Sequence, residues 1–352
     1  MISRRIFGAM AATVLACGLA LTCGCEKKTT SSSSSGTSSS GGGSGTPAAR
    51  DTHVFTMPGG QTPKLAFVPN NPSDFWKIAA AGLKKYESET GIHVDMITPT
   101  NGKVEEQNQI LSNLVSQGYN GIALSSIAPD DQISEINRAC RKTNVICFDS
   151  DCPKSDRLVY IGTNNYEAGK VLGNEIVKLL PNGGTMAVFV GTFAADNAQQ
   201  RLKGIQDVVE PKGIKIVAKK EDNGDREKAR SNVEGIIKAY PDINLLTGLW
   251  SYNGPAIVKA VDAAGKKGQI KVATFDEEDG TLDGIENGTV TCTVVQKPFE
   301  FGYRSAKLLY ELATKGKSAL PKTPFIDTGV TVINADNVKD FRQKLNEMKS
   351  GK

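Results

Sequence analysis

Residues 63–97 read PKLAFVPNNPSDFWKIAAAGLKKYESETGIHVDMI, and this stretch sets the pattern for the rest of the chain. The apolar run 64–68 predicts a buried strand, 73–89 is amphipathic and is ended by Gly91, and 93–97 predicts a second strand. Two strands joined by one helix must pair in parallel, because so short a crossover cannot return the chain as an antiparallel neighbour. The stretch therefore predicts a β-α-β unit.

The alternation of strands and helices continues and then restarts. Strands are predicted at 64–68, 93–97, 121–124, 145–148, 158–161, 185–190, 214–218, 244–249 and 270–275, and helices at 73–89, 104–117, 129–142, 165–180, 197–209, 226–239 and 253–264. The second half begins at residue 185 and repeats the element order and spacing of the first. The sequence thus predicts an α/β protein with two doubly wound parallel-sheet lobes.

After residue 275 the rhythm changes. The remaining elements are predicted at 279–285, 290–295, 299–315, 325–327, 330–332 and 337–347. They are too few for a third domain, so we expect the two lobes to share them. The chain would then cross between the lobes near 149–158, near 292–297 and near Thr328. We assign 61–163 with 297–327 to an N-terminal lobe, and 164–296 with 328–348 to a C-terminal lobe.

The first sixty residues predict export and anchoring. Residues 1–24 have a basic start, an apolar run and small residues, which is typical of a signal peptide. Cys25 follows at the position of a lipid-attachment cysteine, although Thr22 stands where such signals usually carry Leu. Cys17 is an alternative attachment site. The other interpretation of these residues is an ordinary secreted protein. Residues 25–60 are rich in Ser and Gly and predict a flexible tether.

Composition excludes several classes of protein. The net charge of +4 is spread along 352 residues, and no basic stripe carries interleaved aromatic residues, so a nucleic-acid partner is not expected. No later apolar run approaches the length of a membrane span, so we expect membrane contact through a lipid anchor only. With two histidines in the chain, His53 and His93, a mechanism that needs a histidine base is disfavoured.

The cysteines of the body do not predict a metal site. Cys140, Cys147, Cys152 and Cys292 lack the C-x-x-C spacing of zinc sites, and we expect no metal and no cofactor. An oxidising compartment would permit a disulfide, but the spacing does not select a pairing.

Polar and aromatic side chains gather where the predicted strands end. In open α/β sheets ligands bind beyond the carboxyl ends of the strands. The residues there are rich in Asp, Asn, Gln and Ser and include several aromatics; the candidates are Asn70, Asn71, Phe75, Trp76, Asp149, Ser150, Asn197, Gln199, Arg201, Trp250, Asn253, Phe275, Asp276 and Gln296. Any single one can be a helix cap, a turn residue or a hydrophobic edge. As a set they predict a site for a neutral polyhydroxylated molecule, because carboxylates and amides bind hydroxyls and aromatic rings cover the C–H face of a sugar.

The chain resembles the periplasmic sugar-binding proteins of ABC importers, in the group that contains ribose-binding protein. The resemblance covers residues 64–332. It rests on Asn70-Asn71-Pro72 followed by Phe75-Trp76, on the strand ending in Asp149, on Asn197 with Arg201, and on Phe275-Asp276 with Gln296 twenty residues later. It implies the type I periplasmic-binding-protein fold, with two lobes on a multi-crossing hinge, no enzyme activity, and delivery of a small neutral sugar or polyol to importer permease subunits.

Several positions depart from the ribose-binding pattern. Ser150 and Gln199 stand where ribose binders have Arg, Gly224 replaces a stacking Phe, and Trp250-Ser251 replaces Asn-Asp. We therefore expect a roomier site and a monosaccharide or polyol other than ribose.

Two other functions stay open. The protein could present its ligand to a chemoreceptor or sensor kinase instead of an importer. A glycosidase could use Asp149 and Asp276 as paired carboxylates, but the sequence shows no device that would raise either pKa. A repressor of the same architecture is disfavoured, because it would begin with a helix-turn-helix.

Overall fold

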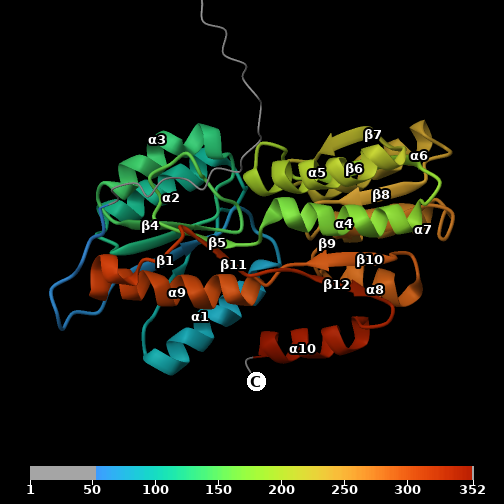
Figure 1. Ribbon diagram of the computed structural model, residues 1–352. Coiled ribbons are helices and arrows are strands. Elements are labelled where there is room, and N and C mark those ends of the chain that lie inside the picture. Colours follow the sequence, from blue (N-terminus) through green and yellow to red (C-terminus); the bar gives the residue numbers. More distant parts are fainter. Residues whose placement is uncertain (1–52, 351–352) are drawn as a thin grey trace, which may run out of the picture. The chain divides into compact units, whose positions relative to one another are not determined.

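The computed structural model describes residues 53–350, which form two α/β lobes (Figure 1). The predicted signal peptide, Cys17, Cys25 and most of the predicted tether lie outside the described residues. Among residues 53–350, no helix is both long enough and apolar enough to cross a bilayer.

The first lobe is built on a six-stranded parallel sheet with strand order β11-β5-β4-β3-β1-β2. Its strands are β1 (Leu65–Val68), β2 (Asp95–Met96), β3 (Gly121–Leu124), β4 (Asn144–Phe148), β5 (Tyr160–Gly162) and β11 (Phe325–Asp327). Its helices are α1 (Trp76–Thr90), α2 (Val104–Ser116), α3 (Pro129–Cys140) and α9 (Pro298–Lys315), the last followed by a 3-10 turn at Gly316–Ala319.

The second lobe has the equivalent strand order, β12-β10-β9-β8-β6-β7. Its strands are β6 (Gly184–Val190), β7 (Ile214–Glu221), β8 (Leu245–Gly248), β9 (Lys271–Phe275), β10 (Cys292–Val295) and β12 (Thr331–Asn334). Its helices are α4 (Asn165–Leu179), α5 (Asp196–Val209), α6 (Arg226–Ala239), α7 (Asn253–Ala263), α8 (Asp279–Asn287) and α10 (Val338–Ser350), with a 3-10 turn at Glu210–Lys212.

Helices cover both faces of each sheet, which explains why strands such as β1, β3 and β4 are buried along their whole length. In the first lobe α1 and α9 pack on one face and α2 and α3 on the other (Figure 1). In the second lobe α4 and α5 cover one face, and α6, α7, α8 and α10 pack on the opposite core. The prediction of two doubly wound lobes is therefore confirmed.

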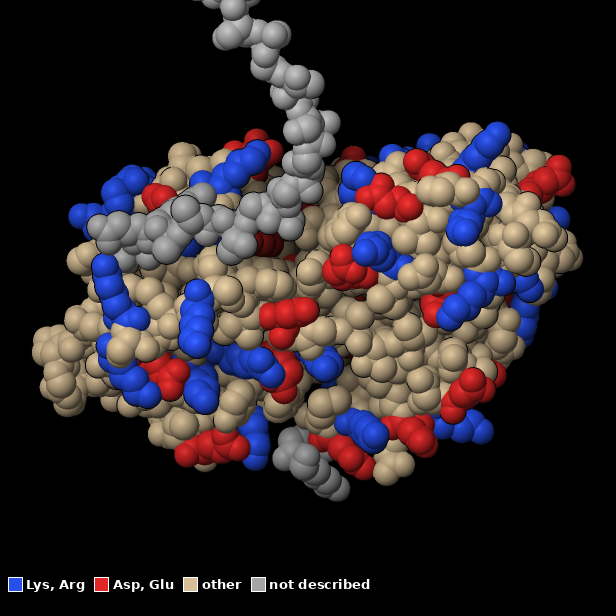
Figure 2. Space-filling view, in the orientation of Figure 1, with Lys and Arg blue, Asp and Glu red and all other residues tan. Residues whose placement is uncertain are grey.

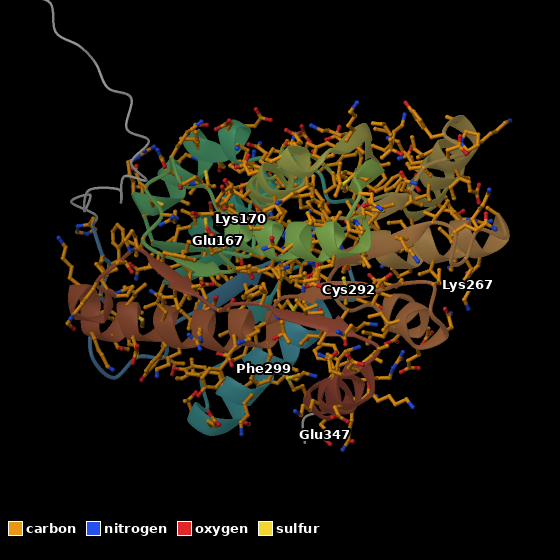
Figure 3. The ribbon with its side chains drawn as sticks, turned by 45° about the vertical axis from the view of Figure 1, so that its right-hand side comes forward. Glu167, Lys170, Lys267, Cys292, Phe299 and Glu347 are labelled. Atoms are coloured by element: carbon orange, nitrogen blue, oxygen red, sulfur yellow. The ribbon has the colours of Figure 1, made fainter. Side chains whose placement is uncertain are left out.

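The chain passes between the two sheets three times. The first passage follows β5, through Thr163 and Asn164, and not the predicted 149–158, because β5 pairs with β4 and keeps that segment in the first sheet. The other passages lie between β10 and α9 and between β11 and β12. Phe299, at the start of α9, packs against the core of the second lobe, so the segment next to the second passage touches both lobes (Figure 3).

One strand departs from the all-parallel expectation. β12 runs antiparallel to β10, with Thr293 opposite Ile333. β11 ends at the carboxyl edge of the first sheet and only residues 328–330 separate it from β12. The chain therefore enters the second sheet at the carboxyl edge and must run in the reverse direction.

Charged side chains of both signs are interspersed on the face shown in Figure 2. Many form pairs along a helix, such as Lys170 Nζ with Glu167 at 3.1 Å on α4 (Figure 3). Exposed pairs of this kind contribute little to stability.

Candidate functional site

A small hollow of about 20 Å³, which we call the inner pocket, lies where strand ends of both lobes meet. Its lining comes from the segments after β1, β4, β8, β9 and β10 and from the start of α5. The lining residues are Asn70, Asn71, Ser73, Phe75, Trp76, Asp149, Asn197, Arg201, Trp250, Ser251, Tyr252, Asp276 and Gln296. Both lobes thus contribute to one polar and aromatic pocket.

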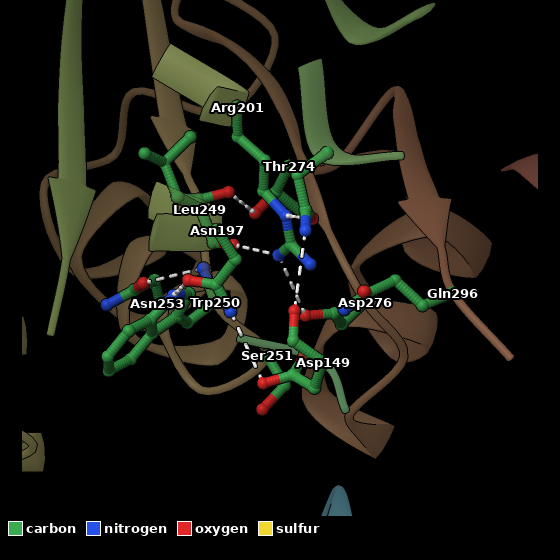
Figure 4. Close-up of polar contacts among 12 residues, drawn as sticks. Asp149, Asn197, Arg201, Leu249, Trp250, Ser251, Asn253, Thr274, Asp276 and Gln296 are labelled. Carbon is green, nitrogen blue, oxygen red and sulfur yellow. Dashed lines mark hydrogen bonds and ion pairs between the residues drawn. The ribbon is translucent and has the colours of Figure 1, made fainter. Parts of the chain in front are cut away.

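Asp149 collects hydrogen bonds from both lobes. Its Oδ2 accepts from Ser125 Oγ at 2.9 Å and Asn70 Nδ2 at 3.4 Å in the first lobe, and from Asn197 Nδ2 at 3.3 Å in the second (Figure 4). Burial raises the pKa of Asp149 to about 6. The expectation that nothing raises this pKa is wrong, because the carboxyl group is removed from water.

Asp276 is held mainly by its own lobe. Its Oδ1 accepts from Gln296 Nε2 at 3.0 Å, and its Oδ2 lies 3.6 Å from Nη1 of Arg201. Burial raises the pKa of Asp276 as well, while Arg201 opposes that rise. The expectation that nothing raises the pKa is therefore wrong for Asp276 as well as for Asp149.

Arg201 is fully buried, and contacts with Asn165, Leu249 and Phe275 fix its guanidinium. Its Nε donates to Asn165 Oδ1 at 2.9 Å, its Nη1 donates to the Leu249 carbonyl at 2.6 Å, and its guanidinium lies 4.4 Å from the Phe275 ring centroid. A buried charge needs such partners. Arg201 therefore presents a rigid cation to the pocket.

Two tryptophans flank the polar groups. Trp76 Nε1 donates to Asn71 Oδ1 at 3.3 Å, and its ring packs edge-on against Phe75 and Phe148. Trp250 Nε1 donates to Asn197 Oδ1 at 3.1 Å. Both indole rings are held by hydrogen bonds and both line the inner pocket.

Three buried polar atoms at the pocket lack a hydrogen-bond partner among the described residues. They are Nη2 of Arg201, Oδ1 of Asn70 and Oε1 of Gln296. Buried polar groups without a partner are rare in native proteins, and each calls for an explanation. One donor and two acceptors facing one pocket fit a ligand whose groups both donate and accept.

The structure brings ten of the sequence candidates together, and they line the inner pocket: Asn70, Asn71, Phe75, Trp76, Asp149, Asn197, Arg201, Trp250, Asp276 and Gln296. The other four do not line it. Ser150 is buried, Gln199 is exposed and donates to the Ala194 carbonyl, Asn253 bonds Asp222 and the Trp250 amide, and Phe275 lies under Arg201.

The candidate set omits three lining residues, Ser73, Ser251 and Tyr252. Ser251 and Tyr252 directly follow Trp250 at a strand end, so their position was visible in the sequence. Ser73 is missing from the set because its position in the sequence favours a helix cap. The helix starts only at Trp76. Ser73 Oγ accepts from the Phe75 amide at 3.3 Å and also lies 3.1 Å from Ser251 Oγ in the other lobe.

Among the described residues, the cysteines form no disulfide, and the cysteines and acidic residues form no metal-binding cluster. Cys140, Cys147, Cys152 and Cys292 are free thiols, and burial raises the pKa of Cys140 and of Cys292 to about 12. Within residues 53–350, no group of three or more His, Cys, Asp or Glu side chains is placed to hold a metal ion.

Comparison with known proteins identifies similar chains. The family described as "Periplasmic binding protein domain" matches residues 65–318. The D-ribose/D-allose-binding protein of Pseudomonas aeruginosa is 24% identical over 266 residues, which cover 71% of this chain and 83% of that protein.

Solved structures of sugar-binding proteins are also similar to this chain. An ABC transporter solute-binding protein from Burkholderia graminis, in complex with D-arabinose, has a TM-score of 0.75 and 31% identity, covering 80% of this chain and 98% of that one. A glucose-galactose-binding protein from Geobacillus stearothermophilus has a TM-score of 0.74 and 27% identity, covering 79% and 99%. These proteins are binding proteins and not enzymes, and the expected fold class is confirmed.

Proposed function

The chain belongs to the periplasmic binding protein domain family, and we propose that it captures a neutral sugar or polyol between its two lobes. The named relatives bind ribose, allose, arabinose, glucose or galactose according to their descriptions, which supports a sugar ligand.

The observation that carries this proposal is the set of unsatisfied buried atoms. Arg201 Nη2 can donate, while Asn70 Oδ1 and Gln296 Oε1 can accept. A hydroxyl group serves either need, since it donates one hydrogen bond and accepts two. The carboxylates of Asp149 and Asp276 disfavour an anionic ligand, and the cation of Arg201 disfavours a cationic one.

We propose a ligand other than ribose. Support comes from Ser150 and Gln199, which replace the two arginines of the ribose-binding pattern and do not line the inner pocket. Hydroxyls that those arginines would bind must find other partners here. A site built around particular hydroxyls rejects sugars that lack them by large factors.

A thermal-shift screen tests the proposal. Purified protein is heated with pentoses, hexoses and polyols, and with amino acids and sugar phosphates as comparison ligands. A ligand that binds only the folded state raises the melting temperature, so we expect one sugar or polyol to stand out. If an amino acid or a phosphate ester gives the largest shift, the proposal of a neutral sugar or polyol ligand is wrong. If ribose gives the largest shift, the proposal of a ligand other than ribose is wrong. Chromogenic glycosides in the same preparation test for hydrolysis, and we expect none.

We further propose that the protein delivers its ligand to the permease of an ABC importer. The description of the Burkholderia graminis relative as an ABC transporter solute-binding protein supports this role. A chemoreceptor or sensor kinase is the alternative partner. A pull-down from membranes with ligand-loaded protein distinguishes the two, and we expect permease subunits to be recovered.

Membrane attachment through Cys25 is also a proposal, supported by the sequence alone. We expect Cys25→Ser to move the protein from the membrane fraction into the soluble envelope fraction, with Cys17→Ser as the matched control that stays attached. A Cys25→Ser protein that still fractionates with the membrane contradicts the assignment. The proposed location of the folded body, outside the cytoplasm, is supported by the predicted signal peptide and does not depend on the lipid.

A further inference from the structure

A second and larger hollow, which we call the outer cleft, adjoins the inner pocket. Its volume is about 500 Å³, against about 20 Å³ for the inner pocket. Asn70, Asn71 and Trp250 line both spaces. The remaining lining comes from both lobes, chiefly from residues 100–105 and 127–128 in the first and from residues 191–192 and 223–225 in the second.

The two volumes differ in what they can hold. The inner pocket has room for about one water molecule, whereas small-molecule sites usually span roughly 300–1,000 Å³. The lobes already touch through Ser73 Oγ and Ser251 Oγ at 3.1 Å and through Asn197 and Asp149 at 3.3 Å. The outer cleft therefore persists while the lobes are in contact around the inner pocket.

Trp250 is the aromatic residue that borders both spaces, together with Asn70 and Asn71. A Cβ on Gly191 would lie 2.1 Å from Cζ3 of Trp250, so the glycine is what lets the indole lie against the backbone. The bond from its Nε1 to Asn197 fixes the ring. At Gly224, by contrast, a Cβ would meet no atom within 4 Å, so the outer cleft is open beside this residue. A fixed aromatic ring beside open space is suited to stacking on a second ring.

The lining of the outer cleft is mostly uncharged and combines apolar residues, such as Val104 and Ile127, with polar ones. Thr100, Asn101, Thr192 and Asn223 contribute hydroxyls and amides. Among the charged residues, Asp225 is already engaged, because its side chain accepts from the Glu227 and Lys228 amides at the start of α6. The buried, unpartnered Asn70 Oδ1 lies on a residue that the two spaces share.

We propose that the ligand has two units: a neutral sugar ring that reaches the groups of the inner pocket, and a second neutral ring, glycosidically linked to it, that occupies the outer cleft. The ligand class is then a disaccharide or a glycoside of similar size. This inference rests on the proposed function and specifies the size of the ligand.

Calorimetric titrations with matched sugars test the inference. The probes are D-xylose with xylobiose, L-arabinose with arabinobiose, D-glucose with cellobiose, and D-galactose with lactose, each disaccharide carrying the monosaccharide at its non-reducing end. We expect one disaccharide to bind at least about tenfold more tightly than its own monosaccharide, a difference of ~1.4 kcal/mol.

A blocking variant locates the second unit. Lys103 is exposed at the start of α2, caps the helix without a side-chain hydrogen bond, and its side chain makes no hydrogen bond or ion pair with other described residues. Lys103→Trp places a bulky ring in the outer cleft, and Lys84→Trp, on an exposed position of α1, is the matched control. We expect Lys103→Trp to weaken the disaccharide about tenfold or more while the monosaccharide changes less than about threefold, and Lys84→Trp to change neither.

The outcomes separate the two proposals. The inference is overturned if monosaccharides bind as tightly as their disaccharides, or if Lys103→Trp weakens both to the same extent; the proposed function then stands. If neither kind of sugar binds, the proposed function fails and the inference fails with it.

Discussion

Asp149 and Asp276 follow the equivalent strands β4 and β9 and share an uncommon backbone conformation. Their φ angles are 57° and 65°, and Asn223 is the one further non-glycine residue with positive φ among residues 53–350. This left-handed region is uncommon for residues other than glycine, although Asp and Asn tolerate it better than most. Such strain tends to persist at functional sites, where it aims a side chain. Here it accompanies a carboxylate at the pocket in each lobe.

Replacing either carboxylate tests its role. Asp149→Asn and Asp276→Asn keep a residue that tolerates positive φ, so the fold is expected to survive. Each removes charge-assisted hydrogen bonds to ligand hydroxyls worth about 1.5–3 kcal/mol, so we expect sugar affinity to fall roughly 10- to 100-fold. Titration calorimetry measures the effect, with the exposed Asp74→Asn as control. Wild-type affinity in both pocket variants would move the ligand elsewhere.

Asp222 supports two segments that border the ligand spaces and should make stability depend on pH. It accepts hydrogen bonds from the Tyr252 hydroxyl, from Asn253 Nδ2 at 3.0 Å and from the Gly224 amide at 2.8 Å. Burial raises its pKa to about 6. The unfolded chain, with a pKa near 4, releases this proton first, so the free energy of unfolding falls as pH rises from about 4 to 6.

Asp222→Asn removes that titration. We expect the variant to be less stable than the wild type at pH 4, because an amide satisfies these donors less well. The gap should then shrink by pH 7 by up to about 2–3 kcal/mol, as the wild type loses stability and the variant does not. Melting temperatures across this range measure the gap. Parallel profiles would show that Asp222 does not titrate in this way.

The sequence locates the carboxylates but not the direction of every neighbour. A strand end identifies an edge of the sheet. Phe275 is the last residue of β9 and lies beneath Arg201, whereas Asp276 has left the strand with a φ of 65° and lines the pocket. On α5, Asn197 and Arg201 are four residues apart and share a face, while Gln199 lies between them on another. Helical spacing alone could have excluded Gln199.

At the scale of elements, each lobe has two helices that cross through reciprocal glycines. In the second lobe, a Cβ on Gly169 of α4 would lie 2.3 Å from the Arg201 carbonyl, and one on Gly204 of α5 would lie 2.1 Å from the Tyr166 carbonyl. Gly82 of α1 and Gly302 of α9 form the equivalent pair in the first lobe. This close approach holds the start of α5, with Asn197 and Arg201, at the pocket.

Gly204→Ala should force α4 and α5 apart. Overpacking of this kind costs about 1–3 kcal/mol, so we expect a lower melting temperature. We also expect weaker sugar binding, because α5 carries two pocket residues. Gly235→Ala in α6 is the matched control: its Cβ would meet no atom within 4 Å, and alanine should stabilise the helix by about 0.5–1 kcal/mol. A Gly204→Ala protein as stable as the wild type would contradict this account of the crossing.

The elements themselves were largely predictable, because the helical and strand periods alternate without interruption from residue 64 to 275. The first and last residues of the elements, and the directions of the strands, were less predictable. α1 begins at Trp76 instead of residue 73, since Ser73 and Asp74 form a turn whose carbonyls accept from the Trp76 and Lys77 amides. The antiparallel direction of β12 depends on where the chain leaves the other lobe, which local sequence does not encode.

At the scale of the whole described body, the three passages between the sheets make a hinge a reasonable expectation. The inner pocket of about 20 Å³ is smaller than any sugar ring requires, so its lining groups must separate before a ligand can reach Asp149 and Asp276. Trp250 is partly exposed, whereas Trp76 is already buried. A change in solvent access on binding should therefore be seen at Trp250 and not at Trp76.

Locking the lobes together tests whether they must separate. Ser73 Oγ and Ser251 Oγ lie 3.1 Å apart across the lobes, so Ser73→Cys with Ser251→Cys places two thiols within reach of a disulfide. We expect the oxidised double variant to take up sugar at least about tenfold more slowly than the same protein after reduction, because the bond opposes hinge opening. Stopped-flow fluorescence of Trp250 follows the rate, and the two single-cysteine variants control for the loss of each hydroxyl. Comparing oxidised and reduced forms of one protein cancels any direct contribution of the two serines to binding. Equal association rates in the two forms would mean that sugar reaches the carboxylates without separation of the lobes, through movement of side chains alone.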